Sequence, residues 1–131
     1  MNPRALLIVT AVIESATGAA LVAAPSLPAS LLLGSALEGV GPVVARVAGS
    51  ALIALSVACW LAREAGASVA GRGVVAGLMV YDVGAAAVLV HAGLALGAHG
   101  VALWPAVGIH AGMAAWCGAC LGRHAGGGHV C

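Results

Sequence analysis

Charged side chains are almost absent from four long stretches of this sequence, and this absence restricts the fold more than any other feature. The 131 residues include five arginines, no lysine and four acidic residues, and seven of these nine stand at the ends of the stretches. A helix needs about 20 apolar residues to cross roughly 30 Å of hydrocarbon. The stretches have about that length and run over residues 5–24, 43–62, 73–96 and 104–121. The sequence therefore predicts four membrane-spanning helices.

The composition supports the same fold class. Hydrophobic residues make up 63% of the chain, charged residues make up 7%, and the mean hydropathy is +1.13. Apolar residues fall on all sides of each predicted helix, as is typical of a helix in lipid. The alternation of apolar and polar residues expected of barrel strands is missing. We therefore expect an all-α integral membrane protein. Its antiparallel four-helix bundle comprises residues 1–124, and a flexible tail rich in Gly, His and Cys follows at 125–131.

The positions of the arginines predict the orientation. Four of the five lie on one side of the predicted spans and the fifth, Arg46, lies on the other. Because cytoplasmic connections carry the excess of basic residues, both termini are expected in the cytoplasm of a bacterial inner membrane. The connections 25–42 and 98–103 then face outward, and Pro25 and Pro28 are expected to end the first helix. The four arginines on the cytoplasmic side are Arg4, Arg63, Arg72 and Arg123.

Glycines four residues apart predict which helices pack most closely. Lipid removes most of the hydrophobic drive for helix association, so small residues that allow close backbone approach supply much of the packing. The third and fourth stretches carry several such pairs, and we expect these two helices to form a tight antiparallel hairpin. The pairs are Gly73 and Gly77, Gly93 and Gly97, Gly108 and Gly112, and Gly118 and Gly122, with Ala45 and Gly49 at the same spacing in the second stretch.

Two acidic residues fall inside the predicted spans. Glu14 and Asp82 lie near the membrane centre, where an ionised side chain costs roughly 2.5–3.5 kcal/mol or more on insertion scales. Two interpretations stay open. Either each carboxyl is protonated or hydrogen-bonded and holds neighbouring helices together, or the pair carries a proton or binds a cation. Arg46 reaches inward to Glu14 or, as its place near a helix end favours, turns outward to Glu38 or lipid phosphate.

A stripe of possible soft-metal ligands runs along the fourth stretch. Its members follow one another at steps of three or four residues and therefore share one helix face. Thiolate, thioether and imidazole suit copper(I) or zinc better than magnesium or calcium. Cysteine and methionine also serve as ordinary packing residues, which is the plainer interpretation. The residues are His110, Met113, Cys117, Cys120 and His124, with Met79 and Asp82 able to oppose them from the third stretch.

Two redox interpretations use the same helices. His91 and His110 are expected at matching depth on adjacent helices, as a pair of haem b ligands would be. The chain has no Phe, one Tyr and three Trp, which are few aromatic residues to line a haem pocket. Cys117 and Cys120 form a CxxC pair, but the predicted orientation puts them at the cytoplasmic end, where thiols are kept reduced. We therefore expect no cofactor, with copper or zinc as the alternative.

A combination of short motifs resembles a known group of proteins. The motifs are Glu14, the ARVAG segment 45–49, Tyr81 with Asp82, and Trp104 and Pro105 with His110. The combination resembles the short four-helix bacterial inner-membrane proteins and, more loosely, the DoxX-like membrane proteins. The resemblance covers nearly the whole chain and implies a bacterial inner-membrane four-helix bundle. It implies no reaction and no catalytic residue.

The sequence contains no catalytic signature, and we expect a role without enzymatic activity. The favoured role is that of an accessory or assembly partner of a larger membrane system, in contact with the lipid bilayer and with other membrane subunits or further copies of itself. The alternative is soft-metal binding or transport through the stripe, and a second alternative is a haem- or thiol-based redox protein. Nucleic acid is not an expected partner, because the net charge is +1 and the arginines do not cluster.

Overall fold

Five helices make up most of the computed structural model, which describes residues 2–66 and 68–125, with side chains up to Gly122. The described residues contain no strand, which confirms the all-α prediction for this part of the chain. The tail predicted at 125–131 lies outside them except for Ala125. The helices are α1 (Pro3–Ala23), α2 (Ser26–Leu33), α3 (Gly41–Ala62), α4 (Val69–Ala95) and α5 (Leu103–Ala125).

Three of the helices are long and apolar enough to cross a membrane. They are α1, α3 and α4, with 21, 22 and 27 residues. Helix α5 has 23 residues but is not among the three, and its Pro105, His110 and two tryptophans reduce its hydropathy. Large apolar side chains such as Val69 and Val80 are exposed on the outside of the molecule, where lipid would meet them. The chain is therefore a membrane protein.

The first connection contains a helix that the sequence analysis did not predict. Pro25 follows the end of α1, as expected, but Pro28 lies in the first turn of α2. Proline is tolerated there because the first N–H groups of a helix have no partner within it. Helix α2 ends at Gly34, whose φ of 81° is the left-handed conformation that terminates many helices.

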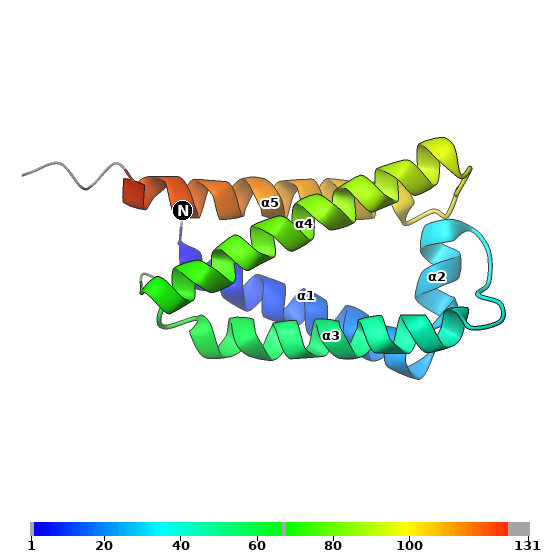
Figure 1. Ribbon diagram of the computed structural model, residues 1–131, viewed down its shortest axis with the longest axis horizontal. Helices are drawn as coiled ribbons and strands as arrows, with labels where there is room; N and C mark the ends of the chain where they lie inside the picture. The colour runs from blue at the N-terminus through cyan, green and yellow to red at the C-terminus, as the bar shows by residue number, and fades with distance from the viewer. Residues whose placement is uncertain (1, 67, 126–131) are drawn as a thin grey trace, which may run out of the picture.

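The four long helices form two antiparallel pairs (Figure 1). Helix α1 packs along α3 and α4 packs along α5, whereas contacts between the pairs are sparse. In the first pair the backbones meet at two glycines. A Cβ on Gly18 would lie 2.6 Å from the carbonyl oxygen of Gly49, and a Cβ on Gly49 would lie 2.7 Å from that of Gly18. These glycines allow α1 and α3 to approach more closely than larger residues would permit.

The predicted pairing of the third and fourth long helices is present, but side chains make its contact. Gly93 faces Leu103 and Trp104, and a Cβ on Gly118 would lie 3.9 Å from the sulfur of Met79. A Cβ on the other glycines of the predicted pairs would meet nothing within 4 Å. The four-residue spacing does not specify which way a helix face points, and this is why it misidentified the contact. These other glycines are Gly73, Gly77, Gly97, Gly108, Gly112 and Gly122.

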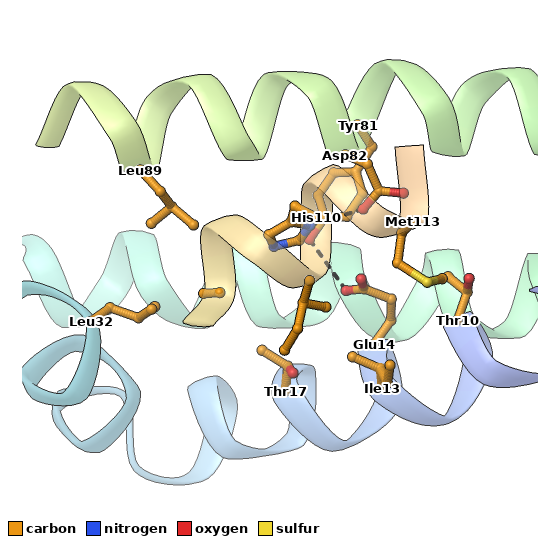
Figure 2. A pocket seen from close by; sticks show the side chains of 12 residues that line it. Thr10, Ile13, Glu14, Thr17, Leu32, Tyr81, Asp82, Leu89, His110 and Met113 are labelled. Carbon is orange, nitrogen blue, oxygen red and sulfur yellow. Dashed lines mark hydrogen bonds and ion pairs between the residues drawn. The ribbon is translucent and has the colours of Figure 1, made fainter. Parts of the chain in front are cut away.

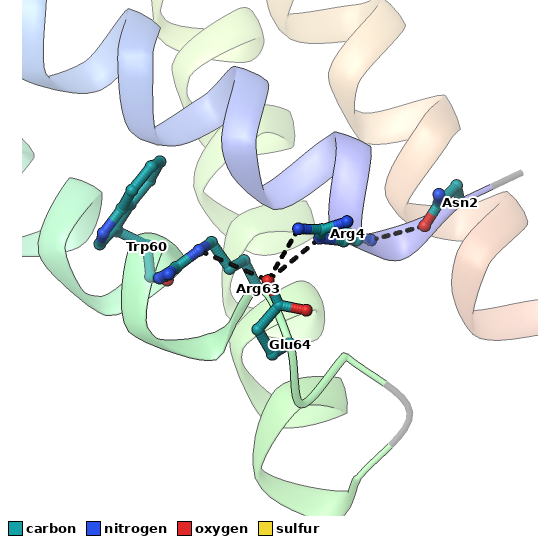
Figure 3. Close-up of polar contacts among 5 residues, drawn as sticks. All are labelled: Asn2, Arg4, Trp60, Arg63 and Glu64. Carbon is teal, nitrogen blue, oxygen red and sulfur yellow. Dashed lines mark hydrogen bonds and ion pairs between the residues drawn. The ribbon is translucent and has the colours of Figure 1, made fainter.

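Polar contacts lie at the end of the bundle where α1 begins and α3 ends (Figure 3). Nη2 of Arg4 lies 2.9 Å from Oε1 of Glu64, which follows α3. Arg63 approaches the same oxygen at 3.7 Å, and its guanidinium lies over the ring of Trp60. Arg4 and Glu64 are more than half exposed, so their ion pair contributes little stability. The pair nevertheless shows that these two helix ends lie side by side.

At the opposite end, α2 joins the two helix pairs. The N–H of Ala102 donates to the carbonyl of Leu31 at 2.8 Å, and the N–H of His99 donates to that of Leu33 at 3.4 Å. Gly100 lies so close to the Leu31 carbonyl that a Cβ would not fit. The connection between α4 and α5 is therefore docked on α2.

The hydrophobic core fills the end of the bundle away from α2. Leu6 and Leu7 of α1, Leu78 of α4 and Cys117 of α5 are fully buried in it. The space between this core and α2 holds the polar residues described next. The buried members of the core are Leu6, Leu7, Ala11, Cys59, Val75, Leu78, Cys117 and Cys120.

Candidate functional site

A cavity of about 200 Å³ lies between the two helix pairs (Figure 2). Helices α1, α4 and α5 form its walls, and Leu32 of α2 lies at one end. We call this cavity the central chamber. Its polar lining residues are Thr10, Glu14, Thr17, Tyr81, Asp82 and His110, and its apolar ones are Ile13, Leu32, Leu89, Ala106, Ile109 and Met113.

Asp82 and His110 are hydrogen-bonded across the α4–α5 pair. Nδ1 of His110 lies 2.8 Å from Oδ1 of Asp82, and Asp82 is only 3% exposed. Both residues were selected from the sequence as polar residues inside the predicted spans. The hydrogen bond places the two side chains against each other between α4 and α5, and their depths in the membrane stay predictions.

Glu14 is joined to α4 by a tyrosine that the sequence analysis did not select as a site residue. The Tyr81 hydroxyl donates to Oε2 of Glu14 at 3.3 Å, and Glu14 is 5% exposed. The Tyr81 ring also meets the His110 ring edge to face, with centroids 5.6 Å apart. Hydrogen bonds therefore link α1 to α4 and α4 to α5 around one chamber. A signal was present in the sequence, since Tyr81 is the one tyrosine of the chain and adjoins Asp82.

Thr10 supplies a polar atom without a hydrogen-bond partner among the described residues. It lies one helical turn from Glu14 on α1, lines the chamber and is 3% exposed. Its hydroxyl oxygen is buried and makes no hydrogen bond with the part of the chain that the structure describes. Buried hydroxyls are usually paired, because leaving one unpaired costs about 1–3 kcal/mol. Thr10 therefore offers a ligand in the chamber both a donor and an acceptor.

The chamber holds more acidic than basic groups. Glu14 and Asp82 contribute two carboxyls, and among the described residues His110 is the one basic side chain that lines the chamber. If both carboxyls are ionised, one negative charge remains uncompensated even when His110 is protonated. An uncompensated buried charge is costly. This arrangement favours the uptake of a proton or the binding of a cation.

Arg46 does not supply the missing positive charge. Its Nε donates to the carbonyl of Val22 at 3.1 Å, in the last turn of α1, and the residue is exposed. Neither Glu14 nor Glu38 forms an ion pair with it among the described residues. Both acidic partners considered from the sequence were wrong. The side chain instead satisfies one of the carbonyls that a helix leaves free at its end.

The predicted stripe of soft ligands divides between the chamber and the core. His110 and Met113 line the chamber, whereas Cys117 and Cys120 are buried in the core as free thiols. The side chain of His124 lies outside the described part. In that part no group of three or more His, Cys, Asp and Glu residues is arranged to hold a metal ion. Cys117 and Cys120 therefore pack in the core, and metal binding by the stripe stays a prediction.

His91 and His110 are not brought together. His91 is exposed, and His110 contacts Asp82. The contacts of Gly93 with Leu103 and of Met79 with Gly118 set the register of α4 against α5. His91 does not line the central chamber with His110, and their matching depth in the membrane stays a prediction. The geometry does not form the bis-histidine arrangement that haem b would need.

Comparisons with known proteins add no identification. No family model matches the chain, and no curated protein or solved structure is significantly similar to it. The likeness to DoxX-like proteins stays a prediction, and the functional argument rests on the chamber.

Proposed function

We propose that this protein binds a cationic ligand inside the membrane, in the central chamber. The observation that carries the proposal is the position of Glu14 and Asp82, two buried carboxyls on separate apolar helices that line one cavity. Placing two such groups in a membrane span is costly. A binding role accounts for this cost, because a bound cation supplies the charge that the chamber lacks.

The alternative for these acids is that they only hold helices together. The Tyr81 hydroxyl donates to one oxygen of Glu14, and Nδ1 of His110 shares a hydrogen bond with one oxygen of Asp82. Interhelical hydrogen bonds of this kind contribute modestly, about 0.6 kcal/mol on average in one membrane protein. A purely structural role does not explain why the acids adjoin about 200 Å³ of unfilled space or why the Thr10 hydroxyl there has no partner. These two features favour binding.

The proposed membrane arrangement has four crossings with both termini in the cytoplasm of a bacterial inner membrane. Helix α5 packs along α4 and has 23 residues, enough to cross about 30 Å of hydrocarbon. Arg4 and Arg63 meet at one end of the bundle through Glu64, and basic residues concentrate on the cytoplasmic side. A reporter enzyme fused to the C-terminus is expected to be active only in the cytoplasm, and periplasmic activity would contradict this orientation.

The structure bears differently on two of the roles that were predicted from the sequence. The accessory or assembly role stays a prediction, because no feature of the described residues tests it. Soft-metal binding has less support than cation binding, since Cys117 and Cys120 are packed in the core.

Cation binding is tested with purified protein in lipid nanodiscs. The probes are tetramethylammonium and the neutral neopentyl alcohol, which have similar size. A ligand at 100 times its Kd stabilises the folded state by about 2.7 kcal/mol, and this corresponds to several degrees in Tm. We expect tetramethylammonium, but not the alcohol, to raise the Tm of the wild type.

Variants distinguish the chamber from other acidic positions. Glu14→Gln and Asp82→Asn each remove a carboxylate from the chamber, and both are expected to weaken the response to tetramethylammonium. Glu38→Gln is the matched control, because Glu38 is exposed in the connection between α2 and α3. The proposal fails if the wild type does not respond, or if the chamber variants respond as strongly as the control variant.

A further inference from the structure

A second hollow adjoins the central chamber and opens along the side of the bundle. It has a volume of about 520 Å³ and lies between α1, α3 and α4. We call it the lateral groove. Tyr81 and His110 line both hollows, as do Thr17, Leu32 and Leu89. The chamber and the groove are therefore continuous. The residues that line the groove alone are Leu21, Leu52, Val80, Gly84, Ala85 and Val88.

The rim of the lateral groove faces the outside of the protein. Val80 and Val88 on α4 are 72% and 68% exposed. Gly84, one turn from each, is also exposed, and a Cβ added to it would meet nothing within 4 Å. Helix α4 is long and apolar enough to cross a membrane, so this rim faces lipid in the proposed arrangement. The gap arises because the two helix pairs make few contacts with one another.

Both ends of the central chamber are covered. The hydrophobic core, with Leu6, Leu7 and Leu78, fills the bundle on one side. Helix α2 covers the other side and is fixed there by the backbone hydrogen bonds from His99 and Ala102. The lateral groove, which is continuous with the chamber, therefore offers a path from the side of the bundle towards the acidic residues.

The polarity of the two hollows matches a molecule with two unlike ends. The chamber brings together Glu14, Asp82 and the unpartnered hydroxyl of Thr10, whereas the residues found in the groove alone are all apolar or glycine. Tyr81 lies where the hollows meet, and an aromatic ring favours a quaternary ammonium group. Charge complementarity therefore places a cationic head in the chamber, and continuity places an apolar chain in the groove.

We propose that the ligand is an amphipathic organic amine that reaches the chamber sideways from the lipid, with its ammonium head beside Glu14 and Asp82 and its alkyl chain in the lateral groove. This inference rests on the proposed function, because it names the class of cation. It adds a route and a second recognition element, which the function alone does not require.

The test compares decyltrimethylammonium with tetramethylammonium, which share one head group. An alkyl chain raises the apparent affinity simply by concentrating the amine in lipid, so comparing the two ligands on the wild type is not sufficient. A Cβ at Gly84 would meet nothing within 4 Å, and Gly84 lines the lateral groove, so Gly84→Leu places a side chain at the groove. Gly77→Leu is the matched control, because Gly77 lies on the same helix, is exposed, has open space around its Cβ and lines neither hollow.

Affinities are measured in nanodiscs by thermal shift. Gly84→Leu is expected to weaken the binding of decyltrimethylammonium about tenfold relative to Gly77→Leu, since overfilling a packed site costs about 1–3 kcal/mol. Tetramethylammonium is expected to bind both variants alike. Val88→Trp serves as a second obstruction if Gly84→Leu does not fold.

The outcomes separate the two proposals. If the alkylated amine binds the obstructed and control variants equally, the lateral groove is not its site, while cation binding by the chamber stands. If neither amine binds the wild type, or if Glu14→Gln and Asp82→Asn change nothing, the proposed function itself fails and this inference fails with it.

Discussion

Replacing Gly49 with alanine tests the close backbone contact between α1 and α3. The new Cβ would lie 2.7 Å from the carbonyl oxygen of Gly18 and 2.8 Å from Cβ of Leu21. One of these neighbours is backbone, so α3 has to move away from α1. Overfilling of this kind costs about 1–3 kcal/mol, and we take the upper end because the backbone cannot rotate aside. The higher helix propensity of alanine offsets about 1 kcal/mol of this cost. The free energy of unfolding is therefore expected to fall by about 2 kcal/mol.

Gly112→Ala is the matched control for this prediction. Gly112 lies on α5, and a Cβ there would meet nothing within 4 Å, so the variant keeps the propensity gain of up to about 1 kcal/mol. The two variants are therefore expected to differ by about 3 kcal/mol. Unfolding in mixed dodecyl sulfate and maltoside micelles, followed by circular dichroism, measures this difference. If Gly49→Ala is as stable as Gly112→Ala, the α1–α3 contact described for these glycines is wrong.

Three further predictions concern side chains. His110→Ala leaves Asp82 buried without its partner and is expected to lower the free energy of unfolding by about 1–3 kcal/mol. His91→Ala, at an exposed position, is expected to change this free energy little. Equal losses for the two variants in the same micelle assay would refute the Asp82–His110 pairing. Glu64→Gln breaks an exposed ion pair with Arg4 and is expected to cost less than about 1 kcal/mol, so a larger loss would mean that this contact is wrongly described. Cys117→Ser puts a hydroxyl into the core and is expected to lower stability by about 1–3 kcal/mol without changing the metal content measured by mass spectrometry; loss of stoichiometric copper or zinc would favour the metal site instead.

The fold class could be predicted from the sequence because it depends on properties of whole segments, and not on which residues face each other. Length, hydropathy and the spacing of arginines indicated a helical membrane protein, and three helices satisfy the criteria of length and hydropathy for a span. Helix α2 was missed because Pro28 was taken as a helix breaker. Proline breaks a helix interior but is accepted in a first turn, and the local sequence does not say which of the two applies.

The candidate site was predicted in part. Glu14, Asp82 and His110 were selected because ionisable groups in a membrane span need an explanation. Tyr81 and Thr10 were missed because a tyrosine and a threonine carry no such cost. Their importance comes from the side chains opposite them, and this depends on how α1 and α4 are placed against each other. Spacing within one helix carries no information about that placement.

The junction between α2 and the 96–102 connection restricts substitutions at one position far more than at its neighbours. The hydrogen bonds that fix it run from backbone N–H groups of His99 and Ala102 to backbone carbonyls of Leu31 and Leu33. Replacements other than proline at these four positions leave the bonding groups in place. Gly100 differs, because a Cβ would collide with the carbonyl of Leu31. Random mutagenesis selected for folded protein should therefore retain glycine at position 100 and accept varied residues around it.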